Sequence, residues 1–219
     1  AATTTQTVAS TQTTTTVATT SNVEILIVEI QITDGSSTHD FIKLFNQSTT
    51  TIADVSDWQL KKRTSGISES SIKVIDNGLS IQPQSYFLWM NSDYALVTTT
   101  KPDATTTQKI SEDNSVALFN KNDEIMDQVA WGSSANPFVE GQSFSQNPSA
   151  GRNLMRKFST TTNQYQDIGD NSVDFILSEF ATSSDASTSP EQSTTTENEE
   201  SPAITNLMAI PSTVRGAVD

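Results

Sequence analysis

The stretch DFIKLFNQSTTTIADVSDWQL, residues 40–60, decides the fold. Within FIKLFN, the aliphatic residues Ile42 and Leu44 occupy every second position, which is typical of a β-strand with one buried face. The polar residues that follow predict a turn, because short polar side chains bond to nearby backbone. Apolar residues return around Trp58, so the stretch predicts two strands joined by a polar connection.

The same pattern extends along the middle of the chain. VEILIVEIQIT at 23–33 predicts a long first strand on a half-solvated sheet. One face of this strand is expected to carry Leu26, Val28, Ile30 and Ile32. Further β-rich runs follow between turn residues, and none shows a helical period over about 11 residues. This pattern excludes a βαβ architecture and predicts an all-β sandwich.

The order of these motifs resembles the lamin tail domain family. After the 40–60 stretch come IQPQSYFL at 81–88, SVALFN at 115–120, DEIMDQVAWG at 123–132, NLMRK at 153–157 and DIGDNSVDF at 167–175. The resemblance covers about residues 23–179. It implies an immunoglobulin-like β-sandwich of the kind found at the end of nuclear lamins and in many secreted or surface-attached bacterial proteins.

Composition changes at both ends of the 219-residue chain. Residues 1–22 are almost entirely Ala, Thr, Gln, Val and Ser, with too little apolar surface to offset the entropy of ordering, so we predict a disordered leader or extended stalk. Residues 180–219 form an acidic Ser/Thr/Pro linker with a short apolar end. The sequence therefore predicts one folded domain, residues 23–179, long enough to bury a sandwich core.

Charge restricts the partners. The formal net charge is −14, from 12 Lys and Arg against 26 Asp and Glu. Nucleic acid is not an expected partner, because such binding needs a basic face that releases counterions from phosphates. Two basic clusters stand out, Lys61 to Arg63 and Arg152 with Arg156 and Lys157. They form either a local patch or, as we favour, a solvated strand end and a solvated loop.

The sequence also indicates a compartment. No cysteine is present, which excludes disulfide and thiolate chemistry. No apolar run reaches the roughly 18 residues that span a bilayer. The chain opens with Ala-Ala-Thr, as a mature protein does after signal-peptide removal, and continues Thr-rich. We expect an extracellular or cell-surface protein, attached to a membrane only through an anchor outside this chain, and leave open glycans on the Thr and Ser runs.

The residues that carry chemistry do not form a catalytic set. His39 is the single histidine, and no G-x-S-x-G motif is present. Neither a zinc site nor a nucleophilic triad is therefore predicted. Whether two carboxylates are paired as in a glycosidase is left open, because their separation is a three-dimensional quantity. We expect a non-catalytic protein.

One acidic cluster offers a metal site: Asp167, Asp170, Asn171 and Asp174. Three carboxylates and an amide are suitable oxygen ligands for Ca²⁺, the only cofactor that the sequence suggests. Their spacing is not that of an EF-hand. In the alternative that we favour, Asp170 and Asn171 bond to nearby backbone amides in a turn while Phe175 fills the edge of the core.

Expectations also attach to one aspartate and to the three tryptophans. Asp127 falls on an apolar face, so its carboxylate is expected to bond to a loop amide. Trp58 and Trp131 match core positions of the family. Trp89 lies in a run with apolar residues on both sides, which indicates a central strand. If exposed, Trp89 would line a sugar-binding platform.

Apolar residues return in AITNLMAIPSTV at 203–214, where they are Ile204, Leu207, Met208, Ile210 and Val214. Either this segment docks on a sheet edge or apolar groove, in this or a neighbouring subunit, or it is the pre-anchor end of a longer precursor. The function we predict is a structural or interaction module of a secreted or cell-surface protein, with a protein partner or self-association. The alternatives are a carbohydrate- or ligand-binding surface module and an accessory domain of an extracellular enzyme.

Overall fold

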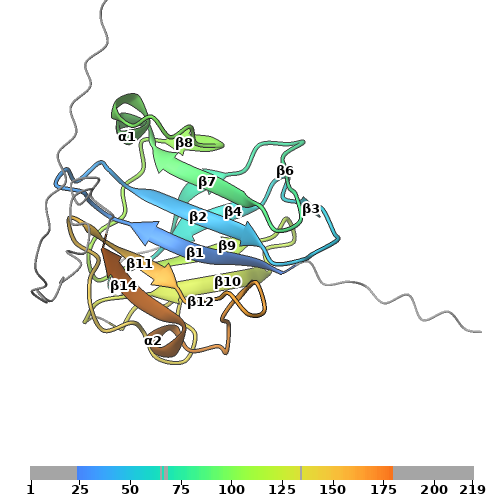
Figure 1. Cartoon of the computed structure of the whole chain (residues 1–219). Coiled ribbons are helices and arrows are strands. Elements are labelled where there is room, and N and C mark those ends of the chain that lie inside the picture. Colours follow the sequence, from blue (N-terminus) through green and yellow to red (C-terminus); the bar gives the residue numbers. More distant parts are fainter. Residues whose placement is uncertain (1–23, 65, 67–68, 134, 180–219) are drawn as a thin grey trace, which may run out of the picture. The chain divides into compact units, whose positions relative to one another are not determined.

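The computed structural model describes residues 24–64, 66, 69–133 and 135–179. The predicted leader and the docking segment, with Ile204, Leu207, Met208 and Ile210, lie outside the described residues. Two sheets pack face to face as a β-sandwich, with the larger in front of the smaller in Figure 1. The all-β prediction is confirmed.

The larger sheet has six strands in the order β14, β11, β1, β2, β7, β8. In chain order these are β1 (Ile25–Gln31), β2 (Phe41–Asn46), β7 (Tyr86–Asn91), β8 (Ala104–Thr106), β11 (Arg152–Arg156) and β14 (Phe175–Glu179). Neighbours are antiparallel except β7 and β8, which run parallel.

The smaller sheet has four strands in the order β10, β9, β4, β5. They are β4 (Gln59–Lys62), β5 (Ser70–Val74), β9 (Ser115–Phe119) and β10 (Ile125–Ala130). Two short pairs join β3 (Ala53–Asp54) to β6 (Ser80–Ile81) and β12 (Phe158–Ser159) to β13 (Gln164–Tyr165). The described helices are α1 (Ser92–Val97) and α2 (Asn171–Asp174), and none is long and apolar enough to cross a membrane.

The core lies between the two sheets. Ile42 and Leu44 face it from β2, as the alternation predicts, and Leu60 faces it from β4. Trp58 and Trp131 are buried in the same cluster, which confirms their expected positions.

β1 contains a β-bulge, and the predicted faces of this strand are wrong on one side of it. The register with β2 shifts between Ile27 and Glu29. The core receives Ile25, Ile27, Ile30 and Ile32. Leu26 and Val28 lie on the outer face with Phe45. An extra residue in a strand reverses the faces beyond it, and an apolar run on both faces does not reveal where it sits.

The outer face of the larger sheet is covered at two places. At one end, Tyr94 and Ala95 of α1 pack on Phe41, Leu88 and Met90. Elsewhere, Tyr165 of the β12–β13 hairpin packs on Leu26, Val28 and Phe45. This face is therefore more apolar than the half-solvated face that the sequence predicted.

The sandwich is closed along two lateral seams. At the first, β8 of the larger sheet meets β5 of the smaller. Trp89 Nε1 donates to Thr106 Oγ1 at 3.1 Å, and Thr106 Oγ1 donates to the carbonyl of Ile72 at 3.0 Å. We call these three residues the neutral seam. At the second, which we call the charged seam, Asp127 of β10 meets Arg156 of β11.

Candidate functional site

The residues predicted to bind calcium lie at α2, where their oxygens bond to the backbone. Asp170 caps α2, and its Oδ1 accepts from the amide of Ser172 at 3.0 Å. Asn171 Oδ1 accepts from the amides of Ala130 and Glu140 at 3.0 and 3.2 Å. Within the described ranges, no group of three or more His, Cys, Asp or Glu side chains could hold a metal ion. The bond of Asp170 agrees with the turn interpretation, whereas Asn171 joins α2 to amides far away in the chain, and the calcium site stays a prediction.

Asp167 and Asp174, the other two predicted ligands, belong to the charged seam. Asp167 Oδ1 lies 3.1 Å and Asp174 Oδ2 lies 3.9 Å from Arg156 Nη1. Asp174 also accepts bonds from the amides of Ile168 and Asp170 at 3.0 and 3.2 Å. Their carboxylates therefore hold the chain around α2 against β11.

Asp127 bonds to a strand amide and to Arg156, and the expectation of a loop amide is wrong. Its two carboxylate oxygens each accept from Arg156 Nη2 at 2.8 Å. Its Oδ2 accepts from the amide of Ile27 at 2.5 Å, while Arg156 Nε donates to the carbonyl of Ile27 at 3.0 Å. β1 pairs with β11 only at Glu29 and Ile30. The ion pair thus satisfies the backbone groups beside the bulge.

Arg156 is therefore a buried structural residue and takes no part in a basic surface patch. Burial raises the pKa of Asp127 to about 6, although Arg156 and the Ile27 amide lower it. Both carboxylate oxygens lie 2.8 Å from Arg156 Nη2, so the geometry of the charged seam is that of an ion pair.

Trp89 is fully buried, so the condition under which it would line a sugar-binding platform is not met. Its exposed fraction is 0% and its ring lies in the main core. β7 is an interior strand, with the core on one face and α1 over part of the other. Apolar residues on both faces of a strand indicate such double coverage.

A partly exposed aromatic cluster lies elsewhere on the outer face of the larger sheet, around the buried ring of Phe45. We call Phe45, Tyr86, Phe158 and Tyr165 the aromatic face. Phe45 and Tyr86 are cross-strand partners whose ring centroids are 4.9 Å apart. The Tyr165 ring lies 5.0 Å from Phe45 and 4.9 Å from Phe158. Tyr86 is 51% exposed and Phe158 is 43% exposed.

The side chain of Gln47 fixes the β12–β13 hairpin on this surface. Its Nε2 donates to the carbonyl of Tyr165 at 3.1 Å, and its Oε1 accepts from the Tyr165 amide at 2.7 Å. Asn163 Nδ2 donates to Gln84 Oε1 at 2.6 Å. The hydroxyls of Tyr86 and Tyr165 lie 3.0 Å apart. Burial and this bond raise the pKa of Tyr165, so its hydroxyl stays protonated.

Polar groups border the aromatic face. Lys43 forms an ion pair with Glu29, and its ammonium lies 5.7 Å from the centroid of the Tyr86 ring. Asn153 Nδ2 donates to the same glutamate at 2.6 Å. The result is a rigid apolar surface with a charged margin.

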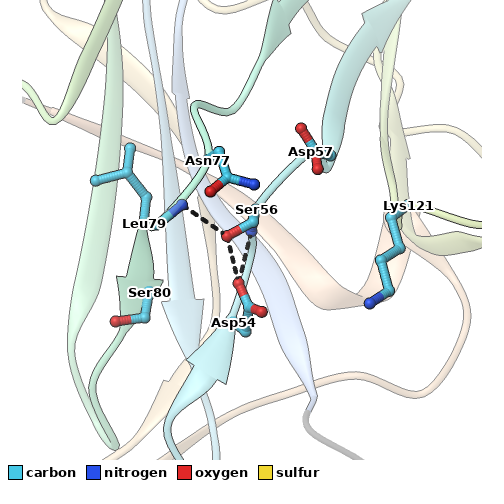
Figure 2. A pocket seen from close by; sticks show the side chains of 8 residues that line it. Asp54, Ser56, Asp57, Asn77, Leu79, Ser80 and Lys121 are labelled. Atoms are coloured by element: carbon cyan, nitrogen blue, oxygen red, sulfur yellow. Dashed lines mark hydrogen bonds between the residues drawn. The ribbon is translucent and has the colours of Figure 1, made fainter.

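A polar pocket of about 420 Å³ lies beside the β3–β6 pair (Figure 2). It is lined by Asp54, Ser56, Asp57, Asn77, Gly78, Leu79, Ser80 and Lys121. Asp54 Oδ1 accepts from the amide and hydroxyl of Ser56 at 3.0 and 2.5 Å. The amide of Gly78 donates to the Ser56 hydroxyl at 3.0 Å. Ligand sites usually combine apolar walls with a few polar groups, and this lining is almost wholly polar. This polar pocket is therefore a weaker candidate for a binding site than the aromatic face.

A comparison with known protein families matches the Lamin Tail Domain over residues 18–133, a little more than half of the 219 residues. The chain belongs to the lamin tail domain family. A search of the curated proteins finds no match. Lamin tail domains are immunoglobulin-like β-sandwich modules of a non-enzymatic family.

The family match ends before the last strands of this lamin tail domain. β11 and β14, which complete the larger sheet, follow residue 133, as does the β12–β13 hairpin. Sequence reasoning missed the aromatic face because its rings lie far apart in the chain, from Phe45 to Tyr165, and only the folded structure brings them together. The sequence held one signal of this surface: the aromatic residues Phe158 and Tyr165 flank a polar turn, which indicates a short hairpin.

Proposed function

We propose that this lamin tail domain is a non-catalytic interaction module of a secreted or cell-surface protein, and that it binds a protein partner through the aromatic face. The observation that carries the proposal is the exposure of Tyr86 and Phe158 on a rigid surface. Aromatic side chains are enriched at protein interfaces, where they bury a large area with little loss of rotamer freedom. An exposed apolar patch with a polar margin is typical of an interaction site.

The ring geometry supports a protein partner over a saccharide. Sugar stacking needs a flat aromatic surface, whereas the ring pairs of the aromatic face are inclined at 46°, 68° and 60°. Inclined rings form an uneven surface, and the side chains of a partner protein can pack between them. The Lys43–Glu29 pair at the margin would set the orientation of that partner.

Export is the second part of the proposal. Residues 1–22 are rich in Thr and carry no charged side chain, a composition suited to an extended segment outside a cell. The acidic balance of the chain, −14, is consistent with a function that does not involve nucleic acid.

The test compares the full chain with the double variant Tyr86→Ala/Phe158→Ala. Each is immobilised and exposed to the exported proteins of the source cell, and retained proteins are quantified by mass spectrometry. The proposal expects at least one protein that the wild type retains and the double variant loses. Sedimentation equilibrium of both chains shows whether that protein is a second copy of this one.

The matched control is Leu96→Ala, because Leu96 is 85% exposed on α1 and lies outside the aromatic face. It should retain the same partner as the wild type. Equal retention by all three chains contradicts a binding role for the aromatic face. Glycan binding that the double variant loses would instead favour the carbohydrate-binding alternative.

A further inference from the structure

A basic pocket of about 150 Å³ lies where β4 ends and β5 begins. Its lining includes Lys62, Arg63, Ser70, Lys109, Ser111 and Asn114. The polar members of this set are two hydroxyls and one carboxamide, and the charged members are all cations. Such a pocket is unexpected in a chain with a net charge of −14.

The positive charge of this pocket is not neutralised by ion pairs. Among the described residues, Lys62, Arg63 and Lys109 have no carboxylate within 4.0 Å, whereas the neighbouring Lys61 pairs with Glu69 at 3.0 Å. Three unpaired cations around one hollow attract an anion more strongly than a single exposed lysine does.

Lys62 is held in place and partly desolvated. Its ammonium donates to the carbonyl of Lys109, which joins the end of β4 to the loop before β9. Burial lowers the pKa of Lys62, although Asp40 raises it. A charged lysine that has lost part of its hydration gains stabilisation from a bound anion. The carboxylate of Asp40 only partly provides this, because burial raises the pKa of Asp40 to about 7.

The floor of the pocket is preorganised. Asn114 Nδ2 donates to the hydroxyl of Ser111 at 3.2 Å. Trp131 Nε1, from the core, donates to the carbonyl of Ser111 at 3.1 Å. The amide of Ser115 donates to Asn114 Oδ1 at 2.8 Å. Groups fixed in this way lose little freedom when a ligand binds.

We propose that the basic pocket binds one tetrahedral oxyanion, sulfate or phosphate, either free or as an ester on a saccharide. Arg63 supplies a planar fork of donors that matches such an anion, and the two lysines add charge. The pocket is smaller than the roughly 300–1,000 Å³ of sites for drug-sized ligands, so it takes the anionic group and not a whole oligosaccharide. This site is separate from the aromatic face and does not depend on its function.

The experiment titrates the isotopically labelled full chain with sodium sulfate and with sodium phosphate at constant ionic strength, using sodium chloride as the reference salt. Backbone amide shifts of the pocket residues report binding. The wild type should show saturable shifts that chloride does not produce. The double variant Arg63→Gln/Lys109→Gln should bind at least about tenfold more weakly.

The matched control is Lys101→Gln, which removes an exposed lysine that lies outside the pocket. It should bind like the wild type. Both variants change exposed side chains, and an unchanged near-ultraviolet circular dichroism spectrum verifies their folding. Non-saturable shifts, equal shifts with chloride, or equal affinity in the wild type and the double variant each overturn the proposal.

A second titration distinguishes the sources of the anion. Glucose 6-phosphate and galactose 6-sulfate are compared with the inorganic ions. Tighter binding of either sugar ester supports a saccharide-borne ligand, and equal binding supports the free ion.

Discussion

The two seams of the sandwich close it with different chemistry. At the charged seam, the buried pair of Arg156 and Asp127 bonds to both backbone groups of Ile27: the arginine donates to its carbonyl and the carboxylate accepts from its amide. At the neutral seam, one hydroxyl, that of Thr106, joins an indole to a carbonyl. A buried charge that loses its partner is far more costly than an unpaired neutral group. One seam is therefore sensitive to single substitutions and to pH, and the other is tolerant.

The largest expected effect is that of Arg156→Met. This change leaves the Asp127 carboxyl buried without its partner, so it either stays charged in an apolar site or takes up a proton at a cost, and the donor to the Ile27 carbonyl is lost. We expect a loss of about 3–5 kcal/mol in the free energy of unfolding, measured by urea denaturation.

The control is the double variant Asp127→Leu/Arg156→Met, which removes both charges. It should recover part of the loss, because apolar residues of similar size replace buried ion pairs at little cost. A double variant no more stable than Arg156→Met would show that the two side chains are not coupled across the seam.

At the neutral seam, Thr106→Val should have a smaller effect. It removes the acceptor of Trp89 Nε1 and the donor to the carbonyl of Ile72 without changing the side-chain volume much. We expect a loss of about 1–3 kcal/mol in the free energy of unfolding. Thr105→Val, at the exposed neighbouring position, should have almost no effect. A loss at Thr106 as large as that of Arg156→Met would contradict the contrast between the seams.

The remaining prediction concerns pH, and it comes from Glu140, whose carboxyl interacts with the acidic residues of the charged seam. Burial, together with the nearby Asp127 and Asp167, raises the pKa of Glu140 from 4.5 to about 8, although Arg156 lowers it. Between these two values the folded chain holds a proton that the unfolded chain releases. The free energy of unfolding therefore falls as pH rises from about 5 to 8.

The measurement is the melting temperature across this pH range. The wild type should melt at a higher temperature at pH 5 than at pH 8, and Glu140→Gln should show a shallower dependence. Asp40 and Asp127, whose pKa values burial also raises, account for the slope that remains in the variant. A melting temperature that increases over this range would refute the assignment.

Local pattern was sufficient for much of the fold. The aliphatic residues of β2 alternate with other residues, so one face was unambiguous, and Ile42 and Leu44 are core residues as predicted. β1 offered no such contrast, because its run is apolar on both faces and the bulge after Ile27 leaves no mark in it. The register of a strand depends on the strands that pair with it on either side, and the local sequence does not identify those strands.

The candidate sites were harder to predict because they join distant residues. Arg156 reads as a surface residue, and only its contact with Asp127, 29 positions earlier, explains its burial. Lys62 was noticed as part of a basic run, but the pocket arises when Lys109 comes alongside it from 47 positions away. Trp89 illustrates the opposite case. A surface role was considered for it on the condition that it is exposed, and its side chain is buried in the core between the two sheets.

The place of β1 in the larger sheet has a consequence for how the chain is made. β1 is the first of the described strands in chain order, yet it lies in the interior of the sheet, and its contact with Arg156 spans 129 residues. Pairing over such separations is slow to form. In a nascent chain, the backbone groups along one edge of β1 stay unpaired until β11 has left the ribosome. In a fragment that stops at residue 133, this edge is never covered. Such a fragment is expected to aggregate through that edge, so the domain completes its folding only when almost all of it has been released.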